Sequence, residues 1–201
     1  MRRAAAACWL TAGCGYLILE AVAAAGFEPS YGYTTNFISD LGRPAISTLA
    51  PLMNGAFYLQ GTGFLAAAIL VSRAERSSKP ELFVALAAAN AVGNVVVGTV
   101  HSGGSCLHVA GAVLAIVGGN GAILAGFPMV AAARWYRVAS QGLAALGLTA
   151  FAALAVQTVA GTAIAPNAVL ERVSVYTIIA WQVTSAIQLW RTRGARTTPP
   201  C

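Results

Sequence analysis

Long apolar segments alternate with short polar ones along most of the chain. A membrane helix needs about 20 mostly apolar residues, and six segments meet this requirement: 4–26, 49–71, 81–100, 107–133, 140–165 and 172–190. The longest polar break contains EPSYGYTTNFISDLGRP, and none is long enough for a second domain. The GGNG at 118–121 marks a point where the fourth helix could break or bend. The pattern therefore predicts one transmembrane domain over residues 1–201, an all-α bundle of six helices.

Composition supports a membrane protein. Of the 201 residues, 58% are hydrophobic and only 9% are charged, whereas soluble domains carry about 25% charged residues. A soluble fold of this size must expose much of its surface to water and could not hide so much apolar surface. Membrane lipids are therefore the expected surroundings. An open sheet is excluded, because its unpaired backbone groups would face lipid.

The basic residues predict the orientation of the bundle. Ten of the twelve Lys and Arg precede the first span or follow the second, fourth and sixth, and only Arg43 and Arg172 lie on the other side. By the positive-inside rule, both termini are cytoplasmic. Nucleic-acid binding has no support, because the chain has no basic stripe with interleaved aromatic residues. The abundance of Ala, Gly and Arg is typical of a GC-rich bacterial genome, so the expected location is the bacterial inner membrane.

Polar side chains gather near the predicted outer ends of the helices. Asp40, the only aspartate of the chain, lies in the first outer loop. Asn90, Asn94 and His101 are spaced by four and seven residues, which places them on one helical face. A charged group in hydrocarbon usually pairs or faces a cavity, so the set predicts a polar cavity that opens outward. The other members are Glu20, Asn36, Ser39, Asn54, His108, Gln157, Thr158, Thr162, Glu171, Arg172 and Tyr176.

Each polar residue also has a structural interpretation. Polar residues in membrane helices often only bond a neighbouring helix, for about 1 kcal/mol each. Asp followed by Leu-Gly is typical of a turn. Pairing with Arg43 or Arg172 would make Asp40 a structural clamp, whereas isolation among apolar walls would favour an acid. The interhelical interpretation is preferred for Gln60, Asn120, Gln182 and Gln188.

Four stretches resemble a known family. They are GYTTNFISDLG, PLMNGAFYLQG, VGTVHSGGSCLHVAGAVLAIVGGN and NAVLERVSVYTIIAW. They are similar to the bacterial multi-pass membrane family "domain of unknown function 998", and the resemblance covers almost the whole chain. It implies a fold and a site location but no reaction. Many relatives have an Asp after the third helix, where this chain has His101. The motif positions that carry over are Asn36, Ser39, Asp40, Gly42, Asn54, His108, Glu171 and Arg172.

Carboxyl and imidazole groups are the residue types of general acid–base catalysis. The preferred hypothesis is an enzyme that cyclises, isomerises or hydrolyses a lipid or isoprenoid substrate. An apolar pocket lined by Trp9, Phe57, Tyr58 and Trp181 would hold the substrate. The catalytic candidates are Asp40, Glu20, His108, His101 and Glu171. The substrate-binding candidates are Asn36, Ser39, Asn54, Asn90, Asn94, Gln157, Arg172, Tyr176 and Trp181.

No cofactor is expected. His101, His108 and Asp40 are potential ligands of a divalent metal, but the spacing of the two histidines is no recognised zinc signature. The four cysteines form no metal or redox pattern. The chain also lacks a Gly-x-Ser-x-Gly motif and a phosphate-binding loop.

Two other classes stay open. A non-catalytic partner or sensor would dock another protein through ISDLG, with Asp40 and the histidines exposed. A proton-coupled or small-molecule transporter usually needs a midplane site reachable from both faces, and the one-sided polar set argues against it. The many Ala and Gly residues would permit close helix contacts in a homo-oligomer.

Overall fold

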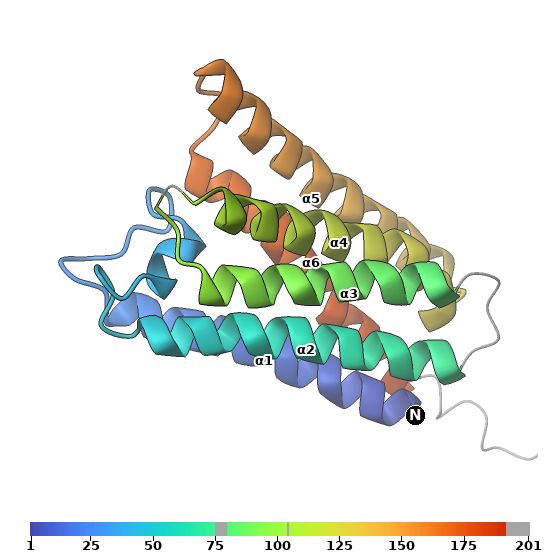
Figure 1. Ribbon diagram of the computed structural model, residues 1–201. Coiled ribbons are helices and arrows are strands. Elements are labelled where there is room, and N and C mark those ends of the chain that lie inside the picture. Colours follow the sequence, from blue (N-terminus) through green and yellow to red (C-terminus); the bar gives the residue numbers. More distant parts are fainter. Residues whose placement is uncertain (75–79, 104, 192–201) are drawn as a thin grey trace, which may run out of the picture.

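The protein is an all-α bundle, as the apolar pattern predicts (Figure 1). The computed structural model describes residues 1–74, 80–103 and 105–191. A short 3-10 helix, η1 (Ile38–Gly42), lies in the connection between the first two helices. The six α-helices of the described residues are α1 (Arg2–Ala25), α2 (Ala50–Ala74), α3 (Pro80–Thr99), α4 (Cys106–Val130), α5 (Arg134–Ala160) and α6 (Asn167–Arg191).

Five of these helices, α1 to α5, are long and apolar enough to cross a membrane. Helix α6 differs because it carries several polar side chains, among them Arg172, Gln182 and Gln188. All three are buried, since α6 packs against α1, α4 and α5. A helix enclosed by other helices needs less apolar surface toward lipid. The architecture is that of a multi-pass membrane protein.

The first four helices agree with the predicted spans to within three residues, but the last two begin earlier. RWYR was interpreted as a break, yet α5 begins at Arg134, and Tyr136 in its first turn is buried with its hydroxyl 2.7 Å from Ser185 Oγ. Helix α5 ends at Ala160, and the next residue, Gly161, has a φ of +65°, which suits a glycine cap. Because α6 begins at Asn167, Glu171 and Arg172 lie in its second turn and not at its start.

Helix α4 does not break at GGNG and is continuous from Cys106 to Val130. The small residues there let α3 and α4 approach closely. A Cβ atom at Gly118 would lie only 2.7 Å from the backbone nitrogen of Asn90. Small residues commonly permit such close approach between membrane helices, so these glycines serve packing.

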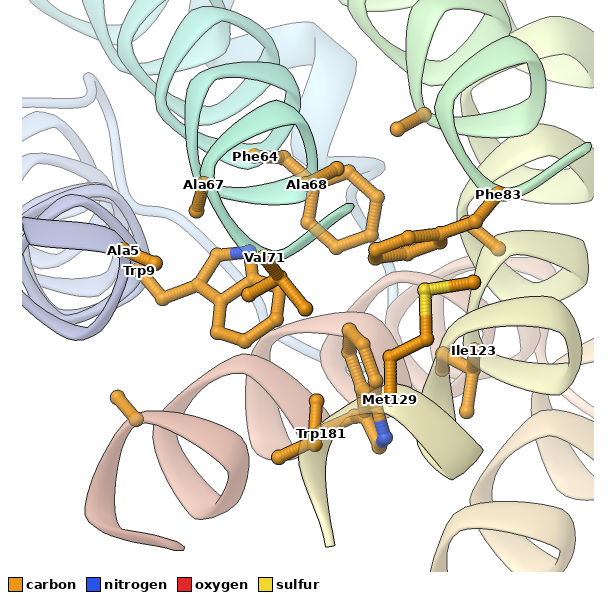
Figure 2. Packing of buried hydrophobic residues seen from close by; sticks show 14 of the residues in the cluster. Ala5, Trp9, Phe64, Ala67, Ala68, Val71, Phe83, Ile123, Met129 and Trp181 are labelled. Atoms are coloured by element: carbon orange, nitrogen blue, oxygen red, sulfur yellow. The ribbon is translucent and has the colours of Figure 1, made fainter. Parts of the chain in front are cut away.

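Aromatic side chains fill the core near the N-terminus. The ring centroid of Trp181 lies 5.1 Å from that of Trp9, 6.1 Å from that of Phe64 and 6.3 Å from that of Phe83 (Figure 2). The Trp181 indole donates a hydrogen bond to Ser140 Oγ at 3.1 Å. Trp9 and Trp181 were expected to line a substrate pocket. They lie instead in this packed core, where aromatic rings bury a large apolar area; the Trp181 N–H is bonded there, whereas Trp9 Nε1 has no hydrogen-bond partner among the described residues.

The connection between α1 and α2 folds back over the helix ends. Ile38 and Leu41 of η1 are buried, and η1 contacts α1, α2 and α6. We call the end of the bundle that η1 covers the η1 end. It also carries the α3–α4 and α5–α6 connections (Figure 1). The opposite end carries the N-terminus (Figure 1). Four of the basic residues used to predict orientation lie outside the described residues: Arg76, Lys79, Arg193 and Arg196.

Candidate functional site

The most deeply buried carboxyl of the site candidates is that of Glu20, at the η1 end of α1. Its side chain is only 1% exposed. Glu20 Oε1 accepts a hydrogen bond from the Tyr176 hydroxyl at 2.7 Å and lies 4.0 Å from Arg172 Nε. Glu20 Oε2 is buried and has no hydrogen-bond partner among the described residues. One oxygen is therefore held by α6, while the other stays available.

Arg172 fastens the α1–α2 connection to α6. Its Nη1 donates to the carbonyl oxygens of Asn36, at 2.8 Å, and Ala168, at 3.1 Å, and its Nη2 donates to the Tyr31 hydroxyl. The guanidinium carbon lies 5.2 Å from the ring centroid of Tyr31 and 5.1 Å from that of Tyr33. A cation against two aromatic rings is favourable, more so where water is excluded. Together with its ion pair to Glu20, the guanidinium therefore links α1, the α1–α2 connection and α6.

Tyr31 is a neutral member of this cluster. Burial raises the pKa of its phenol well above the usual value, although the charge of Arg172 opposes the shift. The hydroxyl accepts from Arg172 and itself donates to the Phe37 carbonyl at 2.8 Å. Tyr31 therefore connects Arg172 to Phe37, the residue before η1.

Two acidic side chains bond backbone N–H groups at the start of η1. Glu171 reaches them from α6, and Asp40 from within η1 itself. Glu171 Oε2 accepts from the Ile38 backbone N–H at 2.5 Å. Asp40 Oδ2 accepts from the Phe37 N–H at 3.0 Å, and Asp40 Oδ1 lies 3.6 Å from Arg43 Nη1. Of the two interpretations of Asp40, these contacts favour the structural clamp, because the carboxylate is occupied by the turn it belongs to.

A small cavity lies beneath η1. Its volume is about 50 Å³, and a buried water needs about 10–15 Å³ by this measure. It therefore has room for a few waters and is too small for a lipid chain. Apolar side chains such as Phe57, Val97 and Ile116 complete its wall. Its polar lining comes from Tyr16, Ser39, Gln60, Asn90, Asn94, His108 and Glu171.

A larger hollow is the open groove between α5 and α6, with a volume of about 450 Å³. Helix α5 leans away from the other helices toward its Ala160 end (Figure 1). Tyr33, Arg172 and Tyr176 contribute to the groove, so it begins beside the Glu20 cluster. The rest of the wall is largely apolar and comes from Thr34, Leu143, Leu146, Val169, Val173, Thr177 and Ala180.

The two histidines have different positions. His108 lines the small cavity, and its Nδ1 lies 2.6 Å from the Val100 carbonyl oxygen. His101 is exposed, and its Nε2 lies 3.4 Å from Asn54 Nδ2. Within the described residues, no three or more His, Cys, Asp and Glu side chains form a group that could hold a metal ion. The structure thus does not bring His101, His108 and Asp40 together as ligands.

The amide side chains that were expected to bind substrate fall into two groups: some line the small cavity, and the others bond the backbone of the connections. Asn90 and Asn94 line the small cavity. Asn54 donates to the Gly42 carbonyl at 3.1 Å and so holds the end of η1. Asn36 Oδ1 accepts from the Gly32 N–H at 3.0 Å, within the α1–α2 connection. Gln157 Oε1 accepts from backbone N–H groups of the α5–α6 connection, outside both hollows.

Sequence reasoning did not single out Tyr16, Tyr31 or Tyr33. Tyr16 precedes Glu20 by four residues and shares its helical face, which was an available signal. The YGY before the loop motif was another, because aromatic rings near an isolated arginine suit cation–π contacts. Gln60 lines the cavity and also makes the interhelical bond expected of it, to Gln182 Oε1 at 2.5 Å.

These features define a multi-pass helical membrane protein with a buried ionic cluster at one end. The sequence model of the family described as "Protein of unknown function (DUF998)" matches residues 10–188. The match covers most of the chain, so the chain belongs to this family, and the resemblance noted from its motifs is confirmed. No curated protein and no solved structure matches the chain.

Proposed function

We propose that the protein is an intramembrane enzyme that acts on a lipid or isoprenoid chain by acid–base chemistry, with Tyr176 and Glu20 as the proton-transferring pair. One observation carries the proposal. The Tyr176 side chain lines the groove between α5 and α6, and its hydroxyl bonds the buried Glu20 carboxyl at 2.7 Å. The Tyr176–Glu20 pair thus lies beside a groove whose apolar wall suits a hydrocarbon chain.

The groove supports a chain-like substrate. Ligand sites commonly measure about 300–1,000 Å³ and are mostly apolar with few polar groups, and this groove has about 450 Å³. Leu143, Leu146 and Val173 supply apolar wall. Because the groove is open between two helices, a chain can enter sideways from the bilayer without passing through water.

The proposed chemistry is a proton cycle. For this step Glu20 is protonated and the hydrogen bond is reversed, so that the Glu20 carboxyl donates to the Tyr176 oxygen. Tyr176 then gives its hydroxyl proton to a double bond of the chain and takes the proton of the Glu20 carboxyl. The resulting carbocation rearranges or closes a ring, then loses a proton from a neighbouring carbon, which restores the pair. The rings of Tyr33 and Tyr176 would stabilise the positive charge. Isomerisation and cyclisation balance in this way without a co-reactant.

In this scheme the other charged residues position the pair. Arg172 orients Glu20 and anchors the connection, while Asp40 and Glu171 hold η1. This differs from the first hypothesis, in which Asp40 was also a candidate acid. The docking alternative for ISDLG has less support, because Ile38 and Leu41 are buried and the Asp40 carboxylate is bonded within the loop.

The test compares lipid extracts of cells that express wild type, Glu20→Gln or Tyr176→Phe at matched membrane levels, by mass spectrometry. We expect a species that appears or disappears with wild type and not with either variant. Glu28→Gln is the matched control, because Glu28 is an exposed carboxylate of the α1–α2 connection, eight residues after Glu20. Extracts that are identical for all four proteins and for cells without the protein would overturn the proposal.

A further inference from the structure

Two buried amide oxygens that belong to residues lining the small cavity beneath η1 have no hydrogen-bond partner among the described residues. Asn90 Nδ2 donates to the Ala115 carbonyl at 2.6 Å, and Asn94 Nδ2 donates to the Asn90 carbonyl at 2.9 Å. A carbonyl oxygen only accepts, so these bonds fix the orientation of both amides and leave each Oδ1 as an acceptor. Asn90 is 2% exposed, and its Oδ1 has no hydrogen-bond partner among the described residues.

Other groups of the cavity lining add hydrogen-bond acceptors. His108 Nδ1 faces the Val100 carbonyl at 2.6 Å and must carry a proton to bond it, so Nε2 is an acceptor whenever the ring is neutral. Gln60 is 3% exposed, and its Oε1 is likewise without a partner in the described part of the chain. The lining also offers donors: the buried Tyr16 hydroxyl, which has no partner there either, the Ser39 hydroxyl, and the second N–H of each amide.

Charge at the η1 end is also unbalanced. Glu20 lies 4.0 Å from Arg172 Nε, and Asp40 lies 3.6 Å from Arg43 Nη1. Glu171 lines the cavity, and no ion pair joins it to a basic side chain within residues 1–74, 80–103 and 105–191. The charge of Arg172 acts on Glu171, but Arg172 is also the ion-pair neighbour of Glu20. A carboxylate withdrawn from water is unfavourable unless it is fully paired, so a positive charge in the cavity would offset the remaining cost.

We propose that this cavity binds a small monovalent metal cation, of which sodium is the test case, through the side-chain oxygens of Asn90, Gln60 and Glu171. Hard cations prefer carboxylate and amide oxygen ligands. One carboxylate balances one positive charge, which favours a monovalent over a divalent ion. The volume of about 50 Å³ accommodates an ion with a few waters. The site is separate from the groove and does not rest on the proposed reaction.

The experiment measures thermal unfolding of the purified full chain in detergent by its tryptophan fluorescence. Sodium chloride is titrated against choline chloride at constant ionic strength. A ligand that binds only the folded state raises Tm with its concentration, so we expect sodium to raise Tm by several degrees in a saturable way. In Glu171→Gln and Asn90→Ala, the half-maximal concentration should rise at least tenfold. A wild-type Tm that does not depend on sodium overturns the proposal.

Asn120→Ala is the matched control. Asn120 is a buried amide of α4 that bonds the Ile116 and Ser174 carbonyls, and it lies outside the cavity lining. This variant should lower Tm and keep the sodium response; equal loss of the response in Asn120→Ala and Asn90→Ala counts against the site. Should Glu171→Gln fail to fold, binding of radioactive sodium to the wild-type protein tests whether the site exists. Saturable binding of one ion per chain is expected, and its absence overturns the proposal.

Discussion

The Tyr176 hydroxyl of α6 donates a hydrogen bond to the Glu20 carboxyl of α1 across 2.7 Å. The contact joins two residues that are 156 positions apart. Glu20 is enclosed, with 1% of its surface exposed, whereas Tyr176 reaches the groove between α5 and α6. The phenol is therefore the link between a buried carboxyl and the open groove between α5 and α6.

If the groove holds the substrate, a large side chain in it should abolish turnover without unfolding the protein. Ala180→Phe places a ring in the groove. We expect the product species to disappear from lipid extracts, with membrane levels unchanged. The matched control is Ala145→Phe, at an exposed α5 position outside the groove, and it should keep activity. Full activity of Ala180→Phe would show that the substrate binds elsewhere.

Asp40→Asn should affect stability and leave the chemistry in place. Loss of a carboxylate that caps a helix costs about 1 kcal/mol, because the Phe37 N–H keeps a weaker acceptor. We expect a modest fall in Tm and the same lipid species as wild type. A variant that keeps the wild-type Tm but loses the species would make Asp40 the acid and contradict the clamp.

Arg172→Gln should be strongly destabilising. It removes the bonds to the Asn36 carbonyl and to Tyr31 and leaves Glu20 without its positive neighbour. Breaking a buried pair costs about 3–5 kcal/mol, so we expect a large drop in Tm and faster proteolysis of the α1–α2 connection. Arg43→Gln is the control. Its side chain is 33% exposed, and exposed pairs contribute about 0.2–1 kcal/mol. Similar losses in both variants would contradict the anchoring role.

The glycines of α4 and α5 should respond in opposite directions to alanine. A Cβ at Gly118 would lie 2.7 Å from the Asn90 nitrogen, whereas one at Gly142 has no neighbour within 4 Å. Overpacking costs about 1–3 kcal/mol, so Gly118→Ala should lower Tm. Gly142→Ala should raise it slightly, because alanine is favoured over glycine in a helix by about 1 kcal/mol. A stable Gly118→Ala would mean that α3 and α4 can separate freely.

Membrane orientation is tested with the native cysteines. Cys106 is exposed at the η1 end, and Cys201 is at the C-terminus, which is predicted to be cytoplasmic. In intact cells, a membrane-impermeant maleimide should label Cys106, while Cys201 should react only after permeabilisation. Cys106→Ser and Cys201→Ser assign each signal. Reversed accessibility would invert the predicted topology and place the η1 end in the cytoplasm.

The sequence alone determined the class of protein and most of its helices. A chain with 58% hydrophobic residues in segments of membrane length has few alternatives to a helical bundle, because every backbone polar group in lipid must be bonded within the protein. The boundaries were less certain where polar residues lie inside a helix. RWYR and NAVLER are helical, and neighbouring helices bury Tyr136 of the first and Ala168 and Arg172 of the second. Such tertiary contacts are invisible in a local pattern.

Only the tertiary structure decided which of the candidate residues face the small cavity, which face the groove and which lie in the packed core. Glu20, His108, Glu171 and Arg172 share one end of the bundle, as their depth along the helices predicted, but depth does not specify direction around a helix. Packing directs Asn90 toward the small cavity and Trp181 into the aromatic core. It also sets Tyr176 between Glu20 and the groove. Such contacts depend on the rotation and spacing of helices far apart in the chain, and the side chains of all of them together set that arrangement.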